Sequence, residues 1–91
     1  MNKQELINNI AEQADISKQD AKKALDAMLA GITEALSKRE EVSLVGFGAF
    51  TVRHRAERQG RNPQTGATMT VAASDIPTFK PGKALKDAIN S

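Results

Sequence analysis

The chain has 91 residues, three aromatic residues, no cysteine and a formal net charge of +2 at pH 7. This length predicts one domain spanning residues 1–91, and the lack of cysteine excludes disulfides and thiolate metal sites. No apolar run approaches the ~20 residues of a membrane helix. We therefore expect a soluble, intracellular protein with no membrane partner, whose small core favours oligomerisation.

The charge is distributed unevenly along the chain. Residues 1–52 carry six Lys or Arg and eight Asp or Glu, whereas residues 53–91 carry seven and three. The C-terminal half is therefore basic, and nucleic acid is the anionic partner that such a distribution favours.

The first half predicts two helices. Asn2 and Ser17 are candidate N-caps, the second for a helix over Lys18–Ser37, and Asp15 interrupts the pattern between them. The second helix is rich in alanine and lacks a polar face for reading bases, which argues against a helix-turn-helix. Apolar residues recur at helical spacing and should form the core: Leu6, Ile7, Ile10, Ala11, Ala14, Ala21, Ala24, Leu25, Met28, Leu29, Ile32 and Leu36.

Residues 42–80 predict an antiparallel sheet. Apolar residues alternate on both sides of Gly46–Gly48, which indicates a tight hairpin with Phe47 and Phe50 in the core. Pro77 confines the returning strand to a sheet edge or a bulge. Beyond it, residues 83–90 predict a short helix.

The stretch Arg53–Gly66 is the most unusual part of the sequence. It holds four arginines and no large apolar side chain, and it ends in the turn sequence Asn62–Gly66. We interpret residues 53–74 as a long basic hairpin, in which Arg53 and Arg55 would share one face. A solvated loop is the plain alternative. Because a polar hairpin is barely stable alone, an anionic partner explains it better.

The sequence contains no catalytic constellation. His54 is the only histidine and lies between arginines, and no glycine-rich phosphate loop or cluster at metal spacing is present. We therefore expect no enzymatic activity, no cofactor and no metal.

The segment GFGAFTVRHRAERQGRNPQT strongly resembles the signature of the bacterial HU and integration host factor family of DNA-bending proteins. MNKQELI at the start and FKPGKALKDAIN at the end resemble the same family, so the resemblance covers essentially the whole chain. The signature positions that match are Gly46, Phe47, Phe50, Arg55, Arg58, Gly60, Asn62, Pro63 and Thr65.

The resemblance implies an α+β fold in an intertwined dimer. Residues 1–37 would form the helical dimerisation base and residues 42–80 a three-stranded antiparallel sheet extended by a DNA-binding arm, followed by the helix 83–90. It also implies a nucleoid-associated, cytoplasmic protein that bends and compacts double-stranded DNA without sequence specificity, with arms in the minor groove and Pro63 as a wedge between base pairs. The implied DNA-binding residues are Lys3, Arg53, Arg55, Arg58, Arg61, Asn62, Pro63, Thr65, Lys80, Lys83 and Lys86.

Three alternatives stay open at this point. A sequence-specific subunit like integration host factor is one, which Pro81 favours and a chain end at Ser91 disfavours. RNA binding through the same arginines, and an assembly module whose arm pairs with other chains, are the others. Asp75 also lies where the family commonly has a basic residue, and we expect it to weaken contact with flanking DNA. The partner subunit would be an identical or a paralogous chain.

Overall fold

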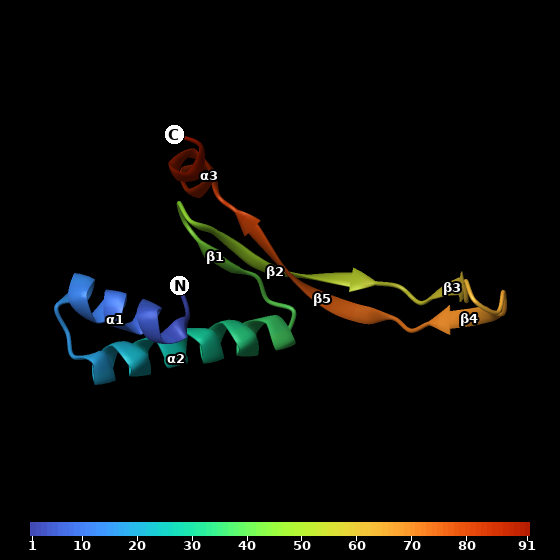
Figure 1. Cartoon of the computed structure of the whole chain (residues 1–91), viewed down its shortest axis with the longest axis horizontal. Helices are drawn as coiled ribbons and strands as arrows, with labels where there is room; N and C mark the ends of the chain where they lie inside the picture. The colour runs from blue at the N-terminus through green and yellow to red at the C-terminus, as the bar shows by residue number, and fades with distance from the viewer. The chain divides into compact units, whose positions relative to one another are not determined.

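The computed structural model describes all residues, 1–91, and contains three helices and five strands (Figure 1). Contacts between residues divide it into two compact units, residues 1–34 and 35–91, which are described separately. The fold is α+β, as predicted. In chain order the elements are α1 (Lys3–Ala14), α2 (Lys18–Ser37), β1 (Val42–Leu44), β2 (Gly48–Arg55), β3 (Arg58–Arg61), β4 (Thr68–Val71), β5 (Ser74–Pro81) and α3 (Lys83–Asn90).

Both predicted N-caps are confirmed. The Asn2 side-chain oxygen accepts a hydrogen bond from the Glu5 backbone N–H at 2.8 Å, before the first turn of α1. The Ser17 hydroxyl does the same for the Asp20 N–H at 3.0 Å. Each cap satisfies one of the N–H groups that a helix start leaves without a partner. The helix starts are therefore determined by local sequence.

The core of the first unit is small. Four residues are buried, and Ile10 packs against them. They come from facing positions of α1 and α2 at helical spacing, as the sequence pattern predicted. The buried residues are Ile7, Ala11, Ala21 and Leu25.

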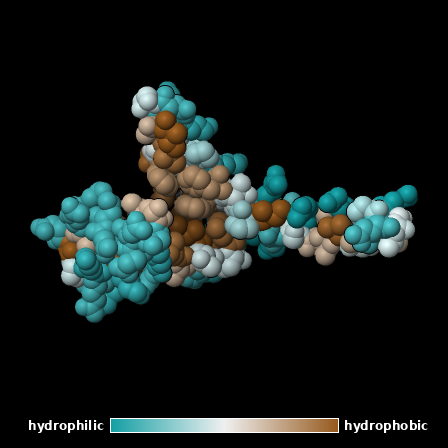
Figure 2. Space-filling model, in the orientation of Figure 1, coloured by the Kyte–Doolittle hydropathy of each residue, from teal (hydrophilic) through white to brown (hydrophobic).

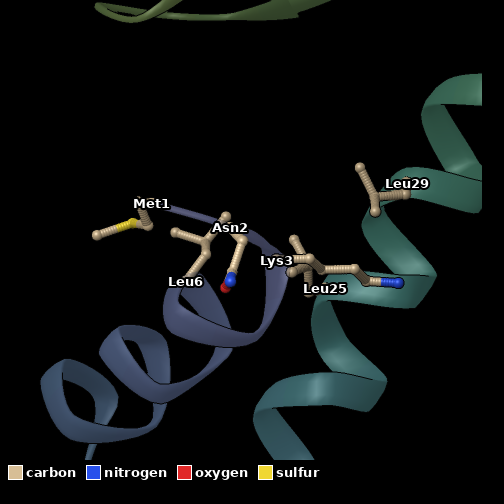
Figure 3. Close-up of a pocket in the computed structure, with 6 residues that line it drawn as sticks. All are labelled: Met1, Asn2, Lys3, Leu6, Leu25 and Leu29. Atoms are coloured by element: carbon tan, nitrogen blue, oxygen red, sulfur yellow. The ribbon is translucent and has the colours of Figure 1, made fainter.

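Part of the predicted core face is exposed in the single chain, which corrects that part of the prediction, whereas Ile10, Ile32 and Leu36 are half-buried. Leu6, Met28 and Leu29 are 38%, 46% and 44% exposed. Leu6 and Leu29 line an open apolar pocket with Met1 and Leu25, seen in Figure 3 between the start of α1 and the middle of α2. Two helices can bury only the faces they turn toward each other. The remaining apolar side chains therefore lie on the surface of this unit.

The end of α2 has the hydrogen bonds of a Schellman motif. The Glu40 N–H donates to the Ala35 carbonyl at 2.9 Å, and the Arg39 N–H donates to the Leu36 carbonyl at 3.0 Å. Arg39 itself is left-handed, with φ of 60°. Glycine is the usual residue there, and a side chain in this conformation costs about 1 kcal/mol.

The three-stranded sheet has the order β1-β2-β5 and is antiparallel throughout. Pro77 lies on β5, an edge strand, as predicted. The Phe79 ring packs against two others. Its centroid lies 4.9 Å from that of Phe50 and 5.6 Å from that of Phe47. Gly48 makes this packing possible, because a Cβ there would lie 2.6 Å from the Phe79 ring.

Hydrophobic residues gather over this sheet, whereas the arm beyond it is mostly hydrophilic (Figure 2). Phe47 was predicted to be in the core, but it is 46% exposed in the single chain. The sheet has one edge at β1 and one at β5, and the rings on its face stack only on one another. The phenylalanine cluster is thus only partly buried.

The last helix, α3, spans the predicted range and has no buried residue. Its start is joined to the β1–β2 turn, because the Gly82 N–H donates to the Phe47 carbonyl at 2.8 Å. No helix in the structure is both long enough and apolar enough to cross a membrane.

Candidate nucleic-acid interface

The predicted arm is a hairpin in two parts (Figure 1). Strands β2 and β5 pair as far as Arg55 and Ser74, and β3 and β4 resume the pairing from Arg58 and Val71. Residues 56–57 and 72–73 interrupt the ladder on both strands. The outer hairpin β3–β4 is therefore connected to the sheet by two short segments outside the ladder.

The tip of the arm is an ordered turn. The Asn62 carbonyl accepts from the Gly66 N–H at 2.7 Å, and the Asn62 N–H donates to the Ala67 carbonyl at 2.8 Å. The Asn62 side-chain oxygen accepts from the Gln64 N–H at 2.8 Å, which makes an Asx turn around Pro63. Gly66 has φ of 72°, a left-handed conformation that suits glycine. These bonds hold Pro63 exposed at the outermost turn.

The four arm arginines are all exposed, but they do not share one face. Arg53 and Arg55 lie on the same face of β2, as predicted. Arg58 and Arg61 are three residues apart on β3, so they lie on opposite faces of the outer hairpin. The arm thus presents positive charge on both of its sides, which suits a groove with phosphates on two walls.

Lys3 does not have a free ammonium group in this structure. Its Nζ lies 2.7 Å from Asp26 Oδ1, and Lys22 Nζ lies 2.8 Å from the other carboxylate oxygen. Figure 3 shows the Lys3 side chain extending from α1 across α2, beside Leu25. Hydrogen bonds from Lys22 and then Lys3 lower the pKa of Asp26 from 3.8 to about 2. A phosphate at Lys3 would have to compete with this carboxylate.

The other predicted contact residues are on the surface of the second unit. Lys80 lies on β5, and Lys83 and Lys86 lie on α3, all exposed. Thr65 is at the tip, where its hydroxyl accepts from the Ala67 N–H at 3.3 Å. The structure thus brings the tip residues together, whereas the lysines lie at the opposite end of the strands from the tip.

One cluster was missed by the sequence analysis. Arg39, in the turn after α2, forms an ion pair through its Nη2 with Asp75 Oδ2. The other oxygen, Asp75 Oδ1, lies 2.9 Å from His54 Nδ1. The hydrogen bond with His54, and then the charge of Arg39, lower the pKa of Asp75. No local signal could have identified this cluster, because Arg39 and Asp75 are 36 residues apart.

The arm has the properties of a binding surface. No group of three or more metal-ligating side chains lies together in the structure, and no buried polar side-chain atom lacks a partner. What the arm offers is exposed guanidinium groups, hydrogen-bonding side chains and one exposed proline.

The chain is similar in sequence to known DNA-binding proteins. The family described as bacterial DNA-binding protein matches residues 1–90. The DNA-binding protein HU of Geobacillus stearothermophilus is 62% identical over 89 residues, which cover 98% of this chain and 99% of that protein. HU-beta of Escherichia coli K12 is 58% identical over 90 residues, covering 99% and 100%.

Solved structures show the same fold. A cocrystal structure of Anabaena HU with DNA has a TM-score of 0.88 and 43% identity, covering 98% of this chain and 97% of that one. HU from Thermotoga maritima has a TM-score of 0.71 and 42% identity, covering 98% of each chain.

Proposed function

Because the chain belongs to the bacterial HU family of architectural, non-enzymatic DNA-binding proteins, we propose that it bends and compacts double-stranded DNA without sequence specificity. The observation that carries this proposal is the arm. It is exposed along its length, is charged on both sides and ends in an ordered turn that presents Pro63. The similar Anabaena protein was crystallised with DNA, which supports the same partner for this chain.

In the proposed complex, the arms lie in the minor groove and Pro63 inserts between two base pairs. HU itself is an established example of minor-groove binding, and wedge insertion is common among such proteins. Arg58, Arg61 and Asn62 contact the groove, with Thr65 beside them at the tip. Because Asn62 uses its side-chain oxygen within the turn, its amide nitrogen is the group that remains for DNA.

The flanks of the site bind the phosphates on either side of the bend. Arg53 and Arg55 line the root of the arm, whereas Lys80, Lys83 and Lys86 hold the flanking duplex, together with Lys3 once Asp26 releases it. Bending a short duplex costs on the order of 1–6 kcal/mol, which such contacts offset. Nicked, gapped or distorted DNA bends at lower cost, so we expect it to bind more tightly.

The functional unit is a dimer in this proposal. Leu6, Met28, Leu29 and Phe47 are too exposed for a finished core, and a second subunit, identical or paralogous, covers them. Since the family acts on DNA, the proposed location is the nucleoid in the cytoplasm.

The primary test is a binding titration on one duplex with and without a central nick, repeated across a salt series. We expect tighter binding to the nicked duplex and a steep loss of affinity as salt rises, because phosphate contacts release counterions. Equal affinity for both duplexes would contradict bending by the tip. Stronger competition by double-stranded RNA would indicate an RNA-binding protein, and a single footprint on a genomic fragment would indicate a sequence-specific subunit.

The wedge is tested by Pro63→Ala. We expect the bend angle, measured by energy transfer between the duplex ends, to fall much more than the affinity does, because phosphate contacts supply most of the binding free energy. Gln64→Ala, one residue further along the tip, is the matched control. A bend angle equal to that of the parent would show that Pro63 is not the wedge.

A further inference from the structure

Three side chains from different parts of the second unit meet at the root of the arm. Arg39 comes from the turn after α2, His54 from β2 and Asp75 from β5. Each Asp75 carboxylate oxygen has its own partner, Oδ1 with His54 Nδ1 at 2.9 Å and Oδ2 with Arg39 Nη2. The carboxylate therefore connects one strand of the arm root to the other and both to the turn. We call this cluster the clasp.

The clasp lies on the face of the sheet opposite the arginines of the arm root. His54 and Asp75 are direct partners in the β2–β5 ladder, as are Phe50 and Phe79 further along. Residues an even number of positions apart share a face of a strand, so the clasp continues the face of the phenylalanine rings. Arg53, one position before His54, lies on the other face. Asp75 is therefore not placed to neutralise the arginines proposed to contact DNA at the arm root.

The backbone conformation of Arg39 supports a structural role for its side chain. Arg39 is left-handed, with φ of 60°, at the Schellman position where glycine is favoured. Non-glycine residues in this region occur where the surrounding structure holds them. Here the guanidinium is held by Asp75, so the residue at the helix end also makes the long-range contact.

The clasp lies close to the point where the three-stranded sheet ends and the outer hairpin begins. The pair His54 and Asp75 is the last but one before the ladder is interrupted at residues 56–57 and 72–73. The ladder between β2 and β5 ends there, so its backbone hydrogen bonds do not determine the direction of the outer hairpin β3–β4. The last side-chain contacts before it therefore have a large influence on where the arm points.

We propose that the clasp is a positioning device: Asp75, held by Arg39 and His54, orients the arm before DNA binds without touching DNA itself. A binding segment that is already oriented loses less conformational entropy on association. The proposal rests on the proposed function of the arm. It also changes the expected role of Asp75, from a weakener of flanking contacts to a support of arm binding.

The test uses two substitutions that break the clasp but change the net charge in opposite directions. Asp75→Ala removes a negative charge, and Arg39→Gly removes a positive charge while relieving the left-handed backbone. If the clasp orients the arm, both variants bind an intact duplex more weakly, by about 3- to 10-fold for one or two released side chains. If Asp75 acts only through charge, Asp75→Ala binds more tightly and Arg39→Gly more weakly, which would overturn the proposal.

The double variant Arg39→Gly/Asp75→Ala has the net charge of the parent. We expect it to bind as weakly as the single variants, because the clasp can be lost only once, and parental affinity would contradict the proposal. Glu40→Ala and Lys23→Ala are matched charge controls outside the clasp. Thermal unfolding of every variant shows whether it is folded under the binding conditions.

A second readout does not involve DNA. NMR order parameters of the amides in residues 56–73 should fall in both single variants of the free protein, while those of residues 48–52 stay unchanged. Unaltered arm order would overturn the proposal even if affinity changed. Failure of the parent to bind DNA would instead contradict the proposed function, so the two failures are distinguishable.

Discussion

The helical unit and the arm both expose side chains that suit a binding partner, but the two surfaces differ in chemistry. The helical unit, residues 1–34, has four buried residues and leaves large apolar side chains such as Leu29 on its surface. The arm buries no residue and exposes guanidinium groups on both sides. The first surface is suited to an apolar partner and the second to an anionic one.

The two surfaces should respond differently to salt. Attraction between exposed charges is screened within about 10 Å at 0.1 M salt, whereas burial of apolar surface is not weakened in this way. If a second subunit covers the helical unit, as proposed, that dimer should therefore persist at salt concentrations that release DNA from the arm.

The largest effect is expected in the helical unit, from Leu29→Ala. Leu29 is 44% exposed in the single chain and Leu25 only 7%. If a second subunit covers Leu29, both Leu29→Ala and Leu25→Ala should lower the free energy of unfolding by about 2–5 kcal/mol. Urea unfolding at several protein concentrations measures this, and the parent midpoint should rise with concentration.

Val45→Ala is the control for this prediction, because Val45 is fully exposed in the β1–β2 turn. It should change the free energy of unfolding by less than about 0.5 kcal/mol. A loss as small as this for Leu29→Ala, together with a parent midpoint independent of concentration, would show that no subunit covers the apolar face.

Substitutions in the arm should weaken DNA binding and leave the free energy of unfolding nearly unchanged. Replacing Arg58 and Arg61 together by alanine should lower DNA affinity at least about 100-fold, because hydrogen bonds to charged groups contribute about 1.5–3 kcal/mol each. The salt slope should fall by about 2, one for each lost phosphate contact. The free energy of unfolding should stay within about 0.5 kcal/mol of the parent, since both side chains are exposed.

The neutral pair Gln59→Ala and Gln64→Ala controls for removal of polar side chains from the same hairpin. It should leave the salt slope unchanged. A change of assembly state with unchanged DNA affinity in the arginine variant would instead favour an arm that pairs with other chains.

The smallest effect is expected from Asp26 and concerns acid stability. Its pKa in the folded chain is lowered to about 2, so the folded state binds fewer protons than the unfolded state in this range. The stabilisation is therefore complete above about pH 4 and is lost as the pH falls toward 2. Asp26→Asn should remove this part of the pH dependence of the melting temperature.

High salt should reduce the Asp26 effect, because the carboxylate and both lysines are partly exposed. Glu12→Gln, on α1 and outside these ion pairs, is the control. An unchanged acid profile for Asp26→Asn would show that the ion pairs with Lys3 and Lys22 contribute nothing to stability.

The sequence predicted the elements well where the signals are local. The caps at Asn2 and Ser17, the helix over Lys18–Ser37 and the turn after Asn62 all depend on residues within five positions of one another. Pro77 was assigned correctly to an edge strand because it lacks an N–H for a second ladder. The expected α+β fold is also confirmed.

The sequence did not predict which of the apolar residues are buried in the single chain. Helical spacing identified one apolar face over residues 6–36, but it cannot say which part meets the other helix and which part meets solvent. Phe47 shows the same limit in the sheet. Periodicity reports which side chains share a face, whereas burial depends on what covers that face.

The element types, the polarity of the arm and the form of its tip could therefore be predicted from the sequence, because they follow from neighbouring residues. The division of the arm into two hairpins and the use of Asp75 became visible only in the folded chain. Those features depend on the register between distant strands and on contacts between residues 21 and 36 positions apart. Such contacts leave no periodic trace in the chain, because each is made by a single pair of side chains that folding brings together.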